Sequence, residues 1–134
     1  MRNARLALLA VAALSTLGAC APAPAAATRT ITIEIEHSAF QPQTIDVQRG
    51  TVVVFVIENT DPIAHEFILG DEAVQDRHEK GTEAHHGAKP GEVSIASGET
   101  ETTTYEFTES GTLIFGCHLP GHYDYGMRGT VRID

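Results

Sequence analysis

The chain has 134 residues, with nine Lys and Arg against eighteen Asp and Glu, which gives a formal net charge of −9. This length fits one domain, and two cysteines can form at most one bridge, which excludes a small fold stapled by several disulfides. The acidic surplus would repel phosphate and argues against a nucleic-acid binder. With 42% hydrophobic and 20% charged residues, the chain has enough apolar surface for a core and is not expected to be disordered.

The N-terminal segment has the form of an export signal. Arg2 and Arg5 precede an apolar run over residues 6–17, which is too short to span a membrane as a mature helix. The run ends in Leu-Gly-Ala-Cys at residues 17–20, which resembles the bacterial lipoprotein signal. In such a signal the chain is cut directly before the cysteine, and that cysteine, here Cys20, is acylated. The alternative is an ordinary secretory signal cut at a nearby alanine. Both interpretations place the protein outside the cytoplasm. Cleavage before Cys20 would remove two arginines and no acidic residue, so that the net charge of the remaining chain would be −11.

A short spacer follows the signal. Residues 21–27 read Ala-Pro-Ala-Pro-Ala-Ala-Ala, with no apolar periodicity and with prolines that favour an extended tether. We therefore divide the chain into a signal peptide at residues 1–19, a lipidated linker at 20–29 and a folded domain at 30–134. An acylated Cys20 would hold that domain at a membrane on the periplasmic side or at the cell surface, and stable anchoring needs more than one acyl chain.

The domain reads as a succession of strands. Ile31, Ile33 and Ile35 alternate with polar residues, which predicts a half-buried strand, and the apolar pattern continues across Pro42, which indicates an edge or a bend. Residues 51–57 are β-branched and aromatic and predict a central strand. Short strands separated by turn residues predict an antiparallel sandwich or barrel. Further strands are expected around residues 65–69, 93–95, 102–107, 112–117 and 129–133.

The segment at residues 70–91 breaks this rhythm. It is poor in apolar residues and rich in acids, and it contains His78, His85 and His86. A short helix from about residue 71 to residue 80 is compatible with its sequence, and a loop this long inside a compact domain is often functional or mobile. Imidazole beside carboxylate suits Cu(II), Zn(II) or Ni(II), so the three histidines are candidate ligands of a secondary metal site. The alternative is a solvated loop.

The C-terminal part of the chain carries the clearest chemical motif. Cys117, His122 and Met127 follow the spacing C-x4-H-x4-M, and they include a cysteine and a methionine outside the signal. Pro120 and Gly121 favour a tight turn, so that Cys117 would end one strand, Met127 would begin the next, and all three donors would converge. Two histidines and one cysteine in a plane, with a weak axial methionine, form the site that suits copper in electron transfer.

The second histidine of such a site must come from elsewhere. His65 is the best candidate because it follows the turn residues 59–62 and begins a strand. Each donor also has a plainer interpretation: Cys117 as a buried core thiol, Met127 as core filler and His65 as a strand-end histidine. A free thiol in an oxidising compartment is at risk, however, and metal ligation would protect it.

With this motif the sequence resembles the cupredoxins, the small blue-copper family that includes plastocyanin, amicyanin and pseudoazurin, over roughly residues 30–134. The resemblance implies an all-β Greek-key sandwich, here with a partly helical insertion around residues 70–91. It also implies one type 1 copper per chain that cycles between Cu(I) and Cu(II), with His65, Cys117, His122 and Met127 as its ligands. The upstream residues that carry the resemblance are Phe40, Pro42, Ile45, Val47, Gly50, Val54, Phe55 and Asn59.

Two features depart from the small electron carriers of the family. Many of these carriers have asparagine directly after the first histidine, where this chain has Glu66, and they lack the long insertion. Both features resemble the periplasmic cupredoxins that are linked to copper tolerance.

Three classes of function compete. The first is an electron carrier with a redox partner protein, and the second is a copper-homeostasis protein that binds, buffers or delivers copper to a copper-handling protein. The third is an enzyme such as a multicopper oxidase, which the single domain disfavours. Multicopper oxidases have a His-Cys-His motif, and this chain has only half of it, because Gly116 precedes the cysteine and His118 follows it. We expect electron transfer, with homeostasis as the alternative and no enzymatic activity. We expect contact with a membrane through the lipid alone, and neither a nucleic acid nor a small-molecule substrate.

Overall fold

The structure of the protein is a computed structural model that describes residues 25–81 and 85–134. The expected signal peptide, Cys20 and half of the expected linker, residues 20–24, lie outside the described residues. Within them the chain forms nine strands and one short helix. In chain order these are β1 (Ala27–Glu36), β2 (Ala39–Gln41), β3 (Thr44–Val47), β4 (Thr51–Asn59), β5 (His65–Gly70), α1 (Glu72–Glu79), β6 (Glu92–Ile95), β7 (Thr100–Phe107), β8 (Gly111–Gly116) and β9 (Arg128–Ile133).

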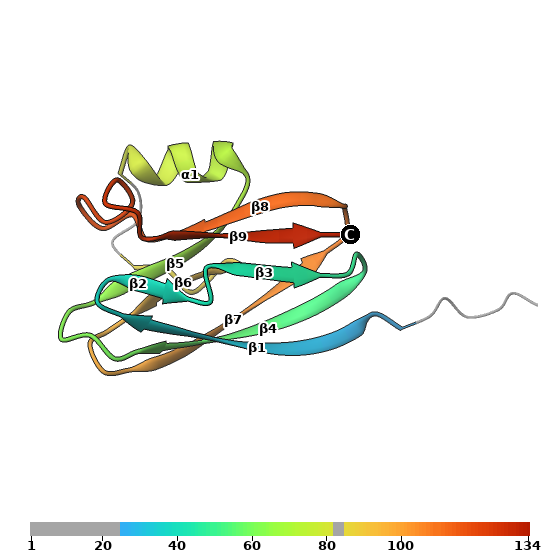
Figure 1. The fold of residues 1–134 in the computed structure, drawn as a ribbon, viewed down its shortest axis with the longest axis horizontal. Coiled ribbons are helices and arrows are strands. Elements are labelled where there is room, and N and C mark those ends of the chain that lie inside the picture. The colour runs from blue at the N-terminus through green and yellow to red at the C-terminus, as the bar shows by residue number, and fades with distance from the viewer. Residues whose placement is uncertain (1–24, 82–84) are drawn as a thin grey trace, which may run out of the picture.

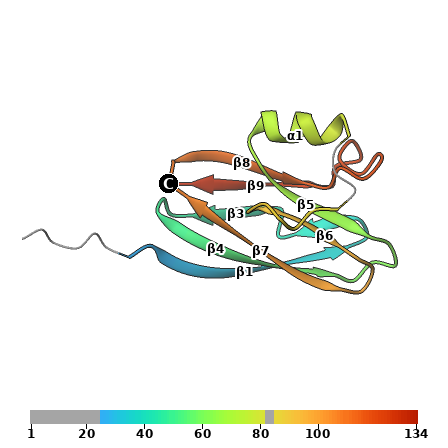
Figure 2. The same ribbon diagram turned by 180° about the vertical axis from the view of Figure 1, so that it is seen from behind.

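The strands form two sheets that pack face to face, as Figures 1 and 2 show. One sheet has the order β2-β1-β4-β7 and the other has the order β3-β9-β8-β5-β6. The helix α1 lies against β5 and β8, on the side of the five-stranded sheet that faces away from the other sheet (Figure 1). The expected all-β sandwich is confirmed, and the insertion contributes the helix.

The expectation of purely antiparallel pairing was wrong for two strand pairs. β1 runs parallel to β4, and β3 runs parallel to β9. After β1 the chain passes through β2 and crosses to the other sheet as β3 before it returns as β4, so β1 and β4 point the same way. Alternation of apolar residues locates strands along the sequence but does not identify the strand beside which each one lies.

The first strand begins three residues before the expected domain boundary at residue 30. Ala27 pairs with Thr51 of β4, and the parallel ladder continues from there to Ile35 and Asn59. The first four residues of β1 are exposed on both faces, so no apolar alternation marks them in the sequence. From Ile31 onward every second residue is buried, as the pattern predicts.

A cluster of fully buried phenylalanines joins the two sheets. Phe40 comes from the four-stranded sheet, and Phe67 and Phe115 come from β5 and β8 of the five-stranded sheet. The ring centroids of Phe40 and Phe115 are 5.3 Å apart, and those of Phe67 and Phe115 are 5.4 Å apart. Edge-on and offset ring pairs of this kind stabilise a core beyond the area that they bury. This packing fixes β5 and β8, the two strands that lead to the candidate site.

The helix is short but firmly placed. Asp71 caps its N-terminus, because its side chain accepts a hydrogen bond from the N–H of Val74 at 2.9 Å. The buried amide of Gln75 donates to the carbonyls of Ile68 on β5 and Ile114 on β8, at 3.2 and 2.9 Å. No helix within residues 25–81 and 85–134 has the length and apolar character needed to cross a membrane.

Candidate metal centre

The four predicted ligands lie at strand ends or in one loop. His65 is the first residue of β5, Cys117 directly follows β8, and Met127 directly precedes β9. His122 lies between the last two, in the turn that connects β8 to β9. This connecting loop is at the end of the sandwich away from the C-terminus (Figure 1).

Three of these side chains converge on one point. The Sγ atom of Cys117 lies 3.3 Å from Nδ1 of His122 and 4.0 Å from Nδ1 of His65, and the two imidazole centroids are 5.1 Å apart. His65 and Cys117 are buried and His122 is partly buried. One thiol and two imidazoles therefore present their donor atoms to a single position.

Backbone hydrogen bonds close the loop beneath this point. The N–H of Cys117 donates to the carbonyl of Met127 at 3.1 Å, and the N–H of Met127 donates to the carbonyl of His122 at 3.0 Å. Gly121 adopts a φ of +82°, and a side chain there would also press on the ring of Tyr125. The Pro-Gly turn thus brings the two ends of the motif together, and it places the buried Met127 directly beside Cys117 in the backbone ladder.

A carboxylate that the sequence analysis missed orients His65. Nε2 of His65 lies 3.0 Å from Oδ2 of Asp61, and the same carboxylate accepts hydrogen bonds from the N–H groups of His37 and Ser38, both at 2.7 Å. With Nε2 engaged in this way, Nδ1 is the nitrogen that faces Cys117. A carboxylate behind a metal-binding histidine is a common arrangement, and the i,i+4 spacing of Asp61 and His65 was the available signal.

Burial and hydrogen bonds set the protonation of this pair. Burial lowers the pKa of His65, so its ring is neutral near pH 7. Burial alone would raise the pKa of Asp61, but the N–H groups of Ser38 and His37, together with His65, outweigh it and hold that pKa below its usual value. A neutral imidazole beside an ionised carboxylate is the state in which a histidine can bind a metal.

Cys117 is a free, fully buried cysteine. Burial raises the pKa of its thiol to about 11. The N–H of Glu66 donates to Sγ at 3.3 Å, which favours the thiolate but does not compensate for burial. The thiol therefore keeps its proton near neutral pH, and a soft cation that prefers thiolate would have to displace that proton as it binds.

The structure brings together two of the three histidines of the insertion. His78 and His86 are buried with their ring centroids 5.2 Å apart, and both face Glu92, which the sequence analysis did not select. His85 is exposed and lies outside this group. Glu92 lies beyond the expected insertion, on β6, and nothing in its sequence neighbourhood signals that it approaches the helix.

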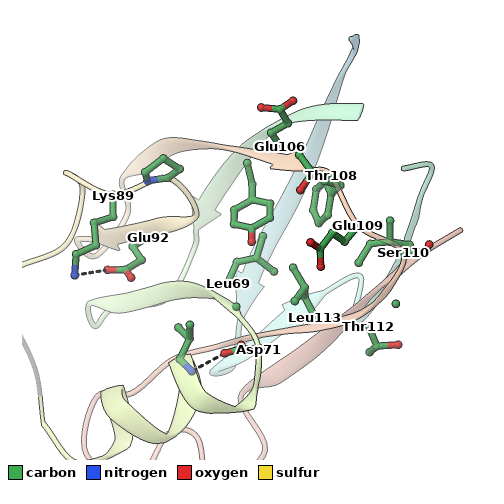
Figure 3. Close-up of a pocket in the computed structure, with 17 residues that line it drawn as sticks. Leu69, Asp71, Lys89, Glu92, Glu106, Thr108, Glu109, Ser110, Thr112 and Leu113 are labelled. Atoms are coloured by element: carbon green, nitrogen blue, oxygen red, sulfur yellow. Dashed lines mark hydrogen bonds and ion pairs between the residues drawn. The ribbon is translucent and has the colours of Figure 1, made fainter. Parts of the chain in front are cut away.

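A surface hollow of about 560 Å³ is lined in part by Lys89 and Glu92 (Figure 3). Leu69 and Leu113 form part of its apolar wall, and the ion pair of Lys89 with Glu92 stands at one edge. None of the residues that line it belongs to the group of His65, Cys117 and His122. The hollow therefore plays no part in this candidate metal centre.

Comparison with known proteins identifies the domain family of this chain. A model of the cupredoxin-like domain matches residues 6–131. The "copper-resistant cuproprotein CopI" of Rubrivivax gelatinosus is 39% identical over 97 residues, which cover 70% of this chain and 59% of that protein. The protein of the same name from Pseudomonas aeruginosa is 30% identical over 126 residues, with 70% of each chain covered. This chain thus spans only about three fifths of the Rubrivivax relative.

Solved structures show the same architecture. The structure of auracyanin B superimposes with a TM-score of 0.67 at 21% identity, and the match covers 84% of this chain and 93% of that one. A likeness at this identity concerns the fold alone. Together with the match over residues 6–131, it shows that the chain belongs to the cupredoxin-like domain family.

Proposed function

We propose that the chain binds one copper ion through Cys117, His65 and His122, with Met127 as a weak axial ligand, and that it carries single electrons as the ion cycles between Cu(II) and Cu(I). The observation that carries this proposal is the convergence of one Sγ and two Nδ1 atoms at 3.3 and 4.0 Å. A thiolate with two imidazoles and a nearby thioether is the donor set of an electron-transfer copper site. When bound, the copper supplies a centre that takes up and releases one electron.

The residues of the chain would hold such an ion in a fixed environment. His65 and Cys117 are attached to β5 and β8, which pair with each other in the sheet and pack on the phenylalanine cluster. Asp61 fixes one imidazole, and the N–H of Glu66 stabilises negative charge on the sulfur. These fixed contacts favour similar donor positions in both oxidation states.

His122 offers the route to a redox partner. Its ring is partly exposed, and the same loop carries the half-buried Leu119 and Tyr123 and the 93% exposed Tyr125. Apolar and aromatic groups around one partly exposed ligand form a surface on which a partner protein can dock closely. The acidic charge of the chain would steer a basic partner toward it.

Copper titration followed by visible absorption tests this proposal. We expect one equivalent of Cu(II) to produce an intense thiolate-to-copper band that a mild reductant bleaches and an oxidant restores. Cys117→Ser should abolish the band, whereas His37→Ala should keep it, because His37 is an exposed histidine whose ring takes no part in the site. Absence of the band from the wild-type chain, or its survival in Cys117→Ser, would overturn the assignment.

A copper-tolerance role is the second candidate. It is supported by the name of the relatives, "copper-resistant cuproprotein", and by Glu66 and the insertion. Expression in a copper-sensitive bacterium tests it: the wild-type chain should raise the copper concentration at which the host grows, and Cys117→Ser should not. A chain with a reversible visible band that gives no tolerance would be an electron carrier alone.

We further propose that the protein works outside the cytoplasm, attached by acylated Cys20. The lipoprotein-like signal at residues 17–20 supports this location. Labelling of cells with a radioactive fatty acid should mark the wild-type protein and leave Cys20→Ala unlabelled.

A further inference from the structure

We propose that His78, His86 and Glu92 form a second metal site, which takes a divalent first-row transition ion such as Cu(II) or Zn(II). The proposal goes beyond the copper centre at Cys117 and does not depend on it. His78 lies in the last turn of α1, Glu92 is the first residue of β6, and His86 lies in the connection between these elements. Three consecutive segments of the chain therefore supply one cluster.

The three side chains direct their polar atoms at one another. Oε2 of Glu92 lies 3.5 Å from Nε2 of His78 and 3.2 Å from Nδ1 of His86. One donor atom from each residue fits within a region 4.8 Å across. A metal ion with nitrogen and oxygen bonds of about 2.0–2.2 Å needs donors at this separation from one another.

The surrounding backbone holds two of the donors in place. Nδ1 of His78 lies 2.9 Å from the carbonyl of Val74, to which it donates, so that Nε2 is the nitrogen that faces Glu92. A backbone carbonyl behind one ring nitrogen is a usual partner of a metal-binding histidine. The N–H of His86 donates to Oγ of Ser94 at 2.9 Å, and the N–H of Ser94 donates to the carbonyl of His86 at 3.2 Å. His86 is therefore fixed alongside β6.

Burial and charge favour a cation at this place. The exposed fractions of His78, His86 and Glu92 are 5%, 2% and 8%. A second buried carboxylate, that of Glu66, places Oε1 3.6 Å from Nε2 of His86. Lys89 reaches Glu92 from outside at 3.7 Å, with a side chain that is 57% exposed. Two buried carboxylates beside two buried imidazoles thus offer nitrogen and oxygen donors of the kind that a divalent ion binds.

The donor types distinguish this site from the copper centre. Imidazole and carboxylate without sulfur suit Cu(II) and Zn(II), whereas the thiolate of Cys117 suits Cu(I) as well. Glu66 joins the two sites, because its N–H donates to Sγ of Cys117 while its carboxylate faces His86. A second ion would thus lie directly behind the copper ligands, and one chain would hold two ions.

The experiment is a Cu(II) titration of three forms of the chain, followed by metal content, visible absorption and electron paramagnetic resonance. The wild-type chain should bind two equivalents, and the second should give weak absorption and an ordinary Cu(II) resonance. His78→Gln/His86→Gln should bind one equivalent and keep the intense band. Cys117→Ser/His122→Ala should lose that band and still bind one ordinary Cu(II), which keeps this test separate from that of the copper centre.

Two further variants make the result decisive. His85→Ala is the matched control, since His85 is an exposed histidine of the same segment, and it should still bind two equivalents. The double variant at His78 and His86 could fail to fold, which would show as loss of the intense band or of the circular dichroism of the folded chain. In that case Glu92→Gln is tested in its place, and it should weaken binding of the second ion at least tenfold. One equivalent in the wild type, or a second equivalent that survives Glu92→Gln unchanged, would show that the cluster is only a buried ion pair.

Discussion

Two groups of candidate metal-binding side chains lie close together in this protein, and they are built in different ways. The first, which we call the copper centre, consists of His65 and Cys117, at the ends of the paired strands β5 and β8, and of His122 in the loop that follows β8. The second, which we call the helix cluster, consists of His78, His86 and Glu92. Its residues come from a short helix, from an edge strand and from the connection between them.

The difference concerns how each group depends on the fold. The copper centre takes two of its three donors from the ends of β5 and β8, whose inner side chains belong to the central core, so we expect opening of the sandwich to abolish it. The helix cluster depends on α1, an eight-residue helix too short to be stable without its contacts to the sheet. Local opening of such an element requires less free energy than global unfolding. A substitution in the core should therefore destabilise both groups, whereas a substitution in the helix should weaken the helix cluster alone.

The largest effect is expected from Phe67→Ala. Phe67 lies two residues after His65, is fully buried and contacts the rings of Phe40, Phe55 and Phe115. The cavity left behind should lower the free energy of unfolding by about 3–5 kcal/mol. Denaturant unfolding followed by circular dichroism measures this loss, and both metal groups should disappear in the same transition.

Phe67→Leu is the milder control, because it keeps most of the apolar volume. If Phe67→Ala lowered the free energy of unfolding by less than about 1 kcal/mol, which is below the range usual for buried phenylalanine, the copper centre would not depend on the packing of this core.

The copper centre could be predicted from sequence more fully than the helix cluster. Cys117, His122 and Met127 lie within eleven residues, so their spacing already encodes a local turn, and the structure brings two of them together with His65. The strand positions were predicted for a similar reason, because alternating burial leaves a local pattern, as in β1.

The parts that were missed depend on how helices and strands fold against one another. Glu92 meets His78 only because α1 folds back over the sheet, and no spacing in the sequence records that approach. The parallel pairing of β1 with β4 was missed for the same reason. Within the insertion, His85 and His86 are adjacent, and burial alone separates the exposed one from the buried one.

A smaller and more selective effect is expected from Asp61→Asn. The carboxylate of Asp61 accepts from two backbone N–H groups and fixes Nε2 of His65, and an amide would turn one N–H₂ group toward these donors. Loss of such a supporting group typically lowers metal affinity about 10–100-fold. Competition with a copper chelator should show this decrease at the copper centre, with the helix cluster unchanged.

Asp46→Asn is the matched control for this prediction. Asp46 is an exposed carboxylate paired with Arg132, far from both groups in the sheet order, and its removal should leave copper affinity within about twofold, since exposed ion pairs contribute little. Equal affinities in Asp61→Asn and Asp46→Asn would contradict the orienting role of Asp61.

The smallest effect should fall on the helix cluster alone. Asp71→Ala removes the side chain that caps α1 at the N–H of Val74, which should destabilise the helix by about 1 kcal/mol, whereas Asp71→Asn keeps a capping oxygen. Hydrogen exchange of the α1 amides should speed up about fivefold in the alanine variant, as 1.4 kcal/mol corresponds to about tenfold. The copper centre should keep its affinity, because none of its donors is attached to α1. If Asp71→Ala weakened both groups equally, the helix and the strand ends would open as one unit, and the contrast between the two groups would not hold.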